Sequence, residues 1–233
     1  MIVSTSHHFI FIHVYKTAGE AVVAALPQIS GRSGVTIWEG RKPRPYPSHP
    51  VGFGLLAKHS TAAMIRSALP AQMWSQYFKF AFVREPVDRV VSLFNYAATV
   101  ATARRRISLD NLLHHSPLRR YDPLDAPSIR AFRATDSFSS YIRHQDTLRD
   151  DAMRPQWLAI ADPSGDCIVD FVGRYENLDR DMEHIQNKLG LPVRIPPRKN
   201  VSSVRKMSRA HVSREDEEYL RELFALDYQH FGY

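Results

Sequence analysis

Two short and almost continuous apolar runs stand out along the chain. The first is residues 9–14 (Phe-Ile-Phe-Ile-His-Val), and the second is residues 78–83, in which only Lys79 is charged. Runs of four to eight β-branched and aromatic residues are typical of buried strands. Residues 167–174 form a third, weaker candidate. These three segments predict the strands of a sheet.

Helical periodicity separates the predicted strands. Pro86 suits the first turn of a helix, and apolar residues then recur at spacings of three, four, seven and eleven from Val87. The other predicted helices are 20–26, ended by Pro27; 62–69, ended by Pro70; 178–189, capped by Asn177; and a last helix that opens at Ser213 in capping-box style. Strands that alternate with helices predict an α/β fold with a mainly parallel central sheet flanked by helices.

Other segments lack such periodicity. Residues 30–54 are rich in glycine and proline, and residues 192–206 are basic and carry prolines, so both are predicted to be loops. Residues 104–152 are rich in arginine, serine and aspartate, and we interpret them as helices and loops inserted between core elements. A length of 233 residues favours a single domain, 1–233, with this insertion at about 104–152.

Composition excludes several protein classes. Hydrophobic residues make up 44% of the chain and charged residues 24%, as in ordinary globular proteins, which excludes disordered and fibrous chains. No apolar run approaches the roughly 20 residues that span a bilayer, and residues 9–14 are too few for a signal-peptide core. One cysteine, Cys167, excludes an internal disulfide framework. We therefore expect a cytoplasmic protein without a transmembrane segment.

The net charge of +7 favours anionic partners, which include nucleic acid, phosphorylated cofactors and acidic glycans. The arginine runs 104–106 and 119–120 have three interpretations: a solvated helix surface, a rim that recognises an anionic or polar acceptor, or a nucleic-acid contact. No helix-turn-helix, zinc or RNP motif accompanies them. We therefore expect no nucleic-acid partner.

The turn after the first predicted strand is suited to phosphate. Ligands of parallel α/β sheets bind at the carboxyl ends of strands, where helix N-termini offer free N–H groups. Here Lys16 adds a charge, Thr17 a hydroxyl, and Gly19 room for close backbone approach. The order Lys-Thr-x-Gly is not that of a Walker A motif. Taken alone, this turn is equally well a plain surface turn.

A second turn changes that balance. Arg84 ends the second predicted strand, and Ser92 lies eight residues later on the following helix, away from its apolar face. Arg84 could bind a phosphate bidentately while Ser92 donates a hydroxyl; alternatively, Arg84 caps the sheet edge and Ser92 has no special role. Two anion-competent turns in one α/β domain favour a ligand with two separated phosphate groups.

Both turns carry a family resemblance. Residues 9–19 resemble the 5′-phosphosulfate loop of the carbohydrate-type (family 2) sulfotransferases, and residues 80–94 resemble their 3′-phosphate motif. Residues 172–178 and 230–233 are also similar to that family. The resemblance covers nearly the whole chain and is weakest at 28–54 and 104–150. It implies a P-loop-like three-layer fold.

The resemblance also implies a function. The donor would be 3′-phosphoadenosine 5′-phosphosulfate (PAPS), the product adenosine 3′,5′-bisphosphate (PAP), and the acceptor a hydroxyl of a carbohydrate or glycoconjugate that can itself be anionic, an activity of class EC 2.8.2. The insertion at 104–152 would form the acceptor side. Carried over by position, Lys16 would bind the 5′-phosphate and the bridging oxygen. The other implied donor contacts are Thr17, Ala18 and Gly19 at the same phosphate, Arg84 and Ser92 at the 3′-phosphate, Tyr175 near adenine, and Arg205 or Lys206 over the nucleotide.

Glu20 departs from the family pattern, which usually has threonine or serine after the glycine. A carboxylate at this donor-binding position repels a phosphate unless it is protonated, paired with Lys16 or turned away. Glu20 is therefore an alternative catalytic base. It could also simply complement the helix dipole in a first turn.

His59 is the preferred catalytic base. It lies between the two phosphate motifs, before a helix, and a histidine titrates near neutral pH. The alternative is an ordinary histidine at the start of a helix. His13 sits within a buried strand and is interpreted as structural. The pair at 114–115 lacks a third metal ligand in sequence, and no metal is required, because Lys16, Arg84 and helix termini can balance the charge.

Two other functions compete with sulfuryl transfer. A P-loop-type nucleotide kinase or phosphotransferase would need Mg²⁺ and a carboxylate at a strand end, whereas Asp170 lies in the middle of a predicted strand. A catalytically inactive anion-binding relative is the other alternative, with Glu20 as its main support.

Overall fold

The computed structural model describes residues 1–26, 35–37, 56–103, 126–194 and 207–233. These residues fold as two compact units. The first contains residues 1–85 and 155–199, and the second residues 86–154 and 200–233. The described part of the predicted insertion, 126–152, belongs to the second unit.

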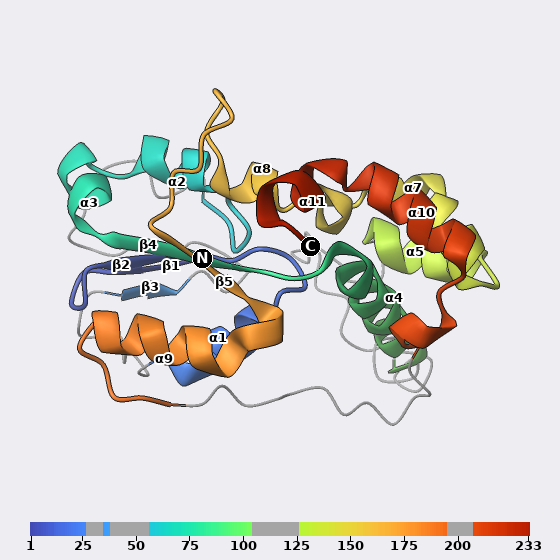
Figure 1. The fold of residues 1–233 in the computed structure, drawn as a ribbon, viewed down its shortest axis with the longest axis horizontal. Helices are drawn as coiled ribbons and strands as arrows, with labels where there is room; N and C mark the ends of the chain where they lie inside the picture. Colours follow the sequence, from blue (N-terminus) through green and yellow to red (C-terminus); the bar gives the residue numbers. More distant parts are fainter. Residues whose placement is uncertain (27–34, 38–55, 104–125, 195–206) are drawn as a thin grey trace, which may run out of the picture. The chain divides into compact units, whose positions relative to one another are not determined.

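The first unit is built on a mixed sheet with the strand order β3-β1-β2-β4-β5 (Figure 1). The strands are β1 (Ile2–Ser4), β2 (Phe9–Ile12), β3 (Val35–Ile37), β4 (Phe78–Val83) and β5 (Phe171–Arg174). β2, β4 and β5 pair in parallel, whereas β1 is antiparallel to both of its neighbours. The α/β class is confirmed, and β1 alone runs against the common strand direction.

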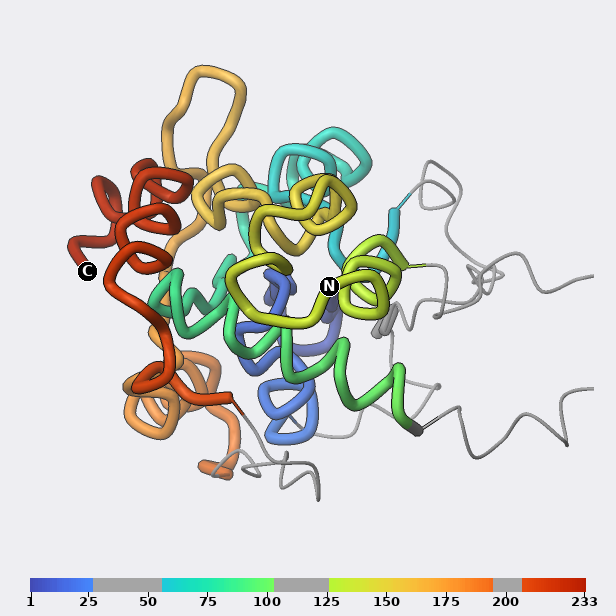
Figure 2. Tube along the Cα trace, turned by 90° about the vertical axis from the view of Figure 1, so that its right-hand side faces the viewer, coloured from blue at the N-terminus to red at the C-terminus, as the bar shows by residue number. Residues whose placement is uncertain are grey.

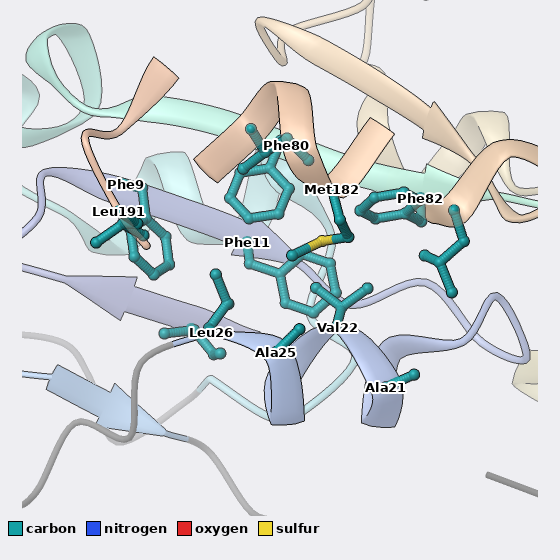
Figure 3. Packing of buried hydrophobic residues seen from close by; sticks show 13 residues of the cluster. Phe9, Phe11, Ala21, Val22, Ala25, Leu26, Phe80, Phe82, Met182 and Leu191 are labelled. Atoms are coloured by element: carbon teal, nitrogen blue, oxygen red, sulfur yellow. The ribbon is translucent and has the colours of Figure 1, made fainter. Parts of the chain in front are cut away.

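Helices cover both faces of this sheet (Figure 1). On one face lie α1 (Gly19–Ala25) and α9 (Leu178–Lys188); on the other lie α2 (Ala62–Ala68), α3 (Ala71–Gln76) and α8 (Trp157–Ile160). Figure 3 shows the packing beneath the first face, where Phe11 and Phe80 meet Val22 of α1 and Met182 of α9. Since β2 is buried on both faces, its sequence is a continuous apolar run.

The predicted strands and helices of this unit agree unevenly with the structure. β2 and β4 are confirmed, as are α1, α2 and α9. The third predicted strand is shorter than expected, because only β5 joins the sheet and Cys167 forms an isolated bridge with Ala161. The loop predicted over 30–54 is wrong at β3, while its other residues lie outside the described part of the chain. Asn177 occupies the N-cap of α9, but its side chain makes no capping hydrogen bond.

The second unit is helical in its described residues. Its elements are α4 (Pro86–Ala103), α5 (Pro127–Ala134), α6 (Phe138–Arg143), α7 (Gln145–Arg149), η5 (Asp151–Met153), η7 (Arg209–His211), α10 (Arg214–Leu223) and α11 (Ala225–Phe231). Figure 2 follows this unit from α4 in green to the C-terminal helices in red. The predicted apolar face of α4 is buried at Val87, Val90 and Val91. The predicted cap of α10 is confirmed, because the Ser213 hydroxyl accepts from the Asp216 N–H.

A buried arginine joins three segments of the second unit. Arg89 is 1% exposed, and its guanidinium donates to the backbone oxygens of Ala152 and Arg154. Its Nη2 lies 3.9 Å from the Asp227 carboxylate, which is also fully buried. Pairing and hydrogen bonds are what make a buried guanidinium tolerable. We therefore assign Arg89 a structural role.

Candidate active site

The loop between β2 and α1 has an unusual backbone. Lys16 and Ala18 adopt left-handed conformations, with φ of 63° and 66°, and Thr17 between them does not. Non-glycine residues rarely adopt positive φ, and the strain is commonly found at functional sites. Alternation of the sign of φ turns successive backbone N–H groups toward one side, which makes a concave anion site. Such a backbone is compatible with the predicted binding of the 5′-phosphate, which stays a prediction.

Thr17 contributes to this loop differently from the expectation. Its side chain is fully buried, and its hydroxyl donates to the Val14 oxygen at 3.1 Å. The Thr17 hydroxyl therefore fixes the loop to Val14, just after β2, and has no exposed surface that a phosphate could contact.

Gly19 is required by a neighbouring side chain. A Cβ at this position would lie 1.8 Å from Nε2 of His13, well inside contact distance. The His13 ring is buried, and desolvation, together with the nearby His59, lowers its pKa well below the ordinary value. The packing supports the structural interpretation of His13. The close backbone approach at Gly19 is thus made to the His13 ring.

His59 is held in a defined orientation beside the loop. Its Nδ1 lies 2.7 Å from the backbone oxygen of His13, and its ring stacks on Tyr15 with centroids 3.6 Å apart and planes tilted by 17°. A carbonyl oxygen only accepts hydrogen bonds, so Nδ1 carries the proton. In the neutral imidazole the lone pair is therefore on Nε2. This is the tautomer that a general base needs, with its proton-accepting nitrogen distinct from the anchored one.

Burial also keeps the His59 imidazole neutral. Desolvation lowers its pKa to about 4, assisted by the positive charges of Lys58 and the Met1 ammonium and opposed by the His13 carbonyl and Glu20. His59 belongs to a tight turn closed by the Ser60 N–H, which donates to the Ala57 oxygen at 3.1 Å. At neutral pH, His59 can accept a proton and cannot donate one from Nε2.

Glu20 is neutralised by a residue that the sequence did not single out. Its carboxylate forms an ion pair with the Lys58 ammonium, from the turn that carries His59. Pairing with Lys16 is one of three alternatives that the sequence leaves open; the structure shows a pair with Lys58. The Glu20 side chain is 71% exposed and that of Lys58 32%. The pair reduces the repulsion that Glu20 would exert on an anion in the loop.

Arg84 and Tyr175, both predicted to bind the donor, lie together in the first unit. The Arg84 guanidinium carbon is 4.1 Å from the centroid of the Tyr175 ring. Its Nε is buried and has no hydrogen-bond partner among the described residues. A stacked guanidinium is held in one plane, which suits bidentate binding of an anion. Arg84 thus covers one face of the Tyr175 ring, and the packing of Tyr175 near adenine stays a prediction.

Sequence reasoning missed Gln156, which is fully buried next to Arg84. Its Oε1 accepts from the Arg84 N–H at 2.9 Å, and its Nε2 donates to the Arg84 oxygen at 2.8 Å. The two residues are 72 positions apart, so no local pattern signals the contact.

The remaining expectations stay predictions. Ser92 lies half-buried on α4 in the second unit. Arg205, Lys206, the histidine pair and both arginine runs lie outside the described residues. Within the described ranges, no group of three or more metal-ligating side chains occurs, and no helix is long and apolar enough to cross a membrane.

Comparison with known proteins identifies the class. A family model described as "Sulfotransferase family" matches residues 1–233, and the chain therefore belongs to this family. Carbohydrate sulfotransferase 14 of Danio rerio is 27% identical over 167 residues, which are 67% of this chain and 44% of that protein. Carbohydrate sulfotransferase 11 of Danio rerio is 24% identical over 165 residues, 67% of this chain and 47% of that protein.

A shorter relative matches along most of its own length. An uncharacterized protein of Archaeoglobus fulgidus is 26% identical over 145 residues, which are 61% of this chain and 92% of that protein. In the two Danio rerio relatives, by contrast, the match spans less than half of the protein. No solved structure matches the chain significantly.

Proposed function

We propose that this protein transfers a sulfuryl group from PAPS to a hydroxyl of a carbohydrate acceptor. The observation that carries the proposal is the His59 imidazole, fixed on the His13 carbonyl with Nε2 unprotonated and stacked on Tyr15 of the anion-binding loop. Membership of the sulfotransferase family supports the reaction class. The relatives named as carbohydrate sulfotransferases support the acceptor class.

The residues of the first unit fit the two anionic ends of the donor. Lys16 and backbone N–H groups of its loop would hold the 5′-phosphate, and Arg84 would hold the 3′-phosphate. The stacking of the Arg84 guanidinium on the Tyr175 ring, which holds its plane, supports this fit. When bound, the donor supplies an activated sulfuryl group. Charge that develops beside the loop would be stabilised by Lys16.

The proton of the acceptor hydroxyl would pass to Nε2 of His59. Because the pKa of His59 is lowered to about 4, the imidazole is unprotonated at neutral pH and can accept the proton, although it is a weaker base than the near-neutral histidine that the sequence led us to expect. Its Nδ1–H stays bonded to the His13 oxygen throughout, which keeps the ring in place. Glu20 is the weaker candidate for the base, since its carboxylate is ion-paired with Lys58.

Sulfuryl transfer tests the proposal directly. Wild type would be incubated with PAPS and a panel of neutral and acidic carbohydrates, and release of PAP would be followed. We expect acceptor-dependent turnover, a fall in kcat of about a hundredfold or more in His59→Ala, and a smaller effect in Glu20→Ala.

A divalent-ion chelator separates sulfuryl transfer from the kinase alternative. Turnover with PAPS is expected to persist in the chelator. Phosphoryl transfer from ATP that the chelator abolishes, or wild-type kcat in His59→Ala, would contradict the proposal.

A further inference from the structure

The turn after β4 is fixed by the side chain of Gln156. This amide is fully buried and bonds to both backbone groups of a single residue, the N–H and the oxygen of Arg84, at 2.9 Å and 2.8 Å. A buried amide with both of its groups satisfied orients its partner strongly, because any rotation would leave buried polar atoms unpaired. Gln156 therefore determines how the Arg84 backbone leaves the strand.

Two further contacts hold the same turn. The Glu85 N–H donates to the Glu176 carboxylate at 2.8 Å, and the Arg84 guanidinium lies on the ring of the preceding residue, Tyr175. Glu176 and Tyr175 both belong to the short helix η6 (Tyr175–Asn177), which follows β5, the strand next to β4. The backbone of Arg84 is thus held by Gln156 and its guanidinium by Tyr175.

We propose that Gln156 is a positioning residue that makes the site selective for a ligand with a 3′-phosphate. It would act through Arg84 without touching the ligand. Bidentate recognition of a phosphate depends on the position and orientation of the guanidinium. Gln156 fixes the backbone from which the Arg84 side chain extends, and from that position the guanidinium reaches the ring of Tyr175. This inference rests on the proposed function, in which Arg84 binds the 3′-phosphate.

Gln186 offers a matched control in the same unit. It is also fully buried, its Nε2 donates to the oxygens of Ala25 and Arg194, and its Oε1 accepts from the Arg194 N–H at 2.9 Å. Loss of either glutamine amide removes a buried hydrogen-bonding group of the same kind. Of these two glutamines, Gln156 is hydrogen-bonded to Arg84, and Gln186 is hydrogen-bonded to Ala25 and Arg194.

The experiment is calorimetric titration with PAP and with adenosine 5′-phosphate, which lacks the 3′-phosphate. The proteins are wild type, Gln156→Met, Gln186→Met, Arg84→Ala and the Arg84→Ala/Gln156→Met double variant. Methionine keeps the shape of glutamine and removes its hydrogen bonds. We expect Gln156→Met to bind PAP about tenfold more weakly, to bind adenosine 5′-phosphate as wild type does, and to have no further effect when Arg84 is absent. Gln186→Met should retain the wild-type ratio of the two affinities.

Several results would overturn the inference. The first two are an equal loss of affinity for both ligands in Gln156→Met, or no loss of affinity for PAP in that variant. The third is a comparable loss of selectivity for PAP in Gln186→Met. The fourth is that Gln156→Met weakens PAP binding as much in the Arg84→Ala background as in wild type. Circular dichroism and thermal melting check folding, and if Gln156→Met does not fold, Gln156→Ala is titrated against the same criteria. A wild type that does not prefer PAP to adenosine 5′-phosphate would instead overturn the proposed function, and the inference with it.

Discussion

At the scale of single residues, a series of contacts connects Gly19, at the start of α1, to His59 through His13. Gly19 leaves room for the ring of His13, and the backbone oxygen of His13 accepts from Nδ1 of His59. The rings of the two histidines lie 4.7 Å apart. We therefore expect substitution of Gly19 or His13 to disturb the position of the His59 ring.

The contact between Gly19 and His13 predicts a stability effect. Gly19→Ala places a Cβ in the space of the His13 ring, so we expect a loss of about 1–3 kcal/mol in the free energy of unfolding, measured by urea denaturation. In a His13→Ala background the clash is absent, and the same substitution should cost much less. Equal costs in the two backgrounds would show that the His13 ring does not limit position 19.

The lowered histidine pKa values predict a pH dependence of stability. The pKa of His59 is about 4 in the folded protein and that of His13 is also lowered, against an ordinary value of 6.5. The folded protein therefore binds fewer protons than the unfolded chain in this range, and its stability should fall as the pH drops from about 6.5 toward 4. Each histidine contributes a slope of at most about 1.4 kcal/mol per pH unit.

Urea denaturation between pH 4.5 and 7.5 checks this expectation. His59→Gln should have a visibly shallower slope than wild type, while His230→Gln, at an exposed position of α11, should keep the wild-type slope. A slope unchanged in His59→Gln would mean that His59 is not buried as the structure shows.

At the scale of elements, an ion pair connects the start of α1 with the turn before α2. Glu20 lies in the first turn of α1, and Lys58 immediately precedes His59. Their ion pair joins residues 38 positions apart and lies at the start of α1, directly after the loop predicted to bind the donor. An isolated exposed pair contributes little to stability, so its consequence should be seen in ligand binding.

Removal of Lys58 should weaken anion binding through Glu20. In Lys58→Ala the carboxylate regains its full repulsion, and we expect the affinity for PAP to fall about two- to fivefold at low salt and less at high salt. Adding Glu20→Gln should restore the affinity. Arg66→Ala, which removes another surface pair of the first unit, serves as the control. A loss in Lys58→Ala that Glu20→Gln does not relieve would contradict this role.

The same scale shows what the sequence could predict. β2 and β4 are buried on both faces, and α4 has one apolar face. The continuous apolar runs of the strands and the helical periodicity of α4 therefore predict these elements from the local sequence. β1 has only three residues and α8 only four, too few for any periodicity. Likewise, the loop of Lys16 is visible as a turn after a strand, whereas the contacts of Gln156 with Arg84 and of Lys58 with Glu20 form only when distant segments meet.

At the scale of the whole molecule, the first unit holds most of the predicted donor site. The loop of 15–20, His59, Arg84 and Tyr175 all belong to residues 1–85 and 155–199. The family match covers both units, residues 1–233, and the net charge of +7 suits a protein that binds a polyanionic donor. Donor recognition should therefore be measurable by itself, before any acceptor is identified.

Calorimetric titration of wild type and Arg84→Ala with PAP and with ATP tests the account most directly. We predict that wild type binds PAP in preference to ATP, and that Arg84→Ala loses about ten- to a hundredfold in affinity for PAP, since hydrogen bonds to a charged group are worth about 1.5–3 kcal/mol. Arg66→Ala should bind as wild type does. Preference for ATP, or unchanged binding of PAP by Arg84→Ala, would contradict the assignment of this site to a sulfuryl donor.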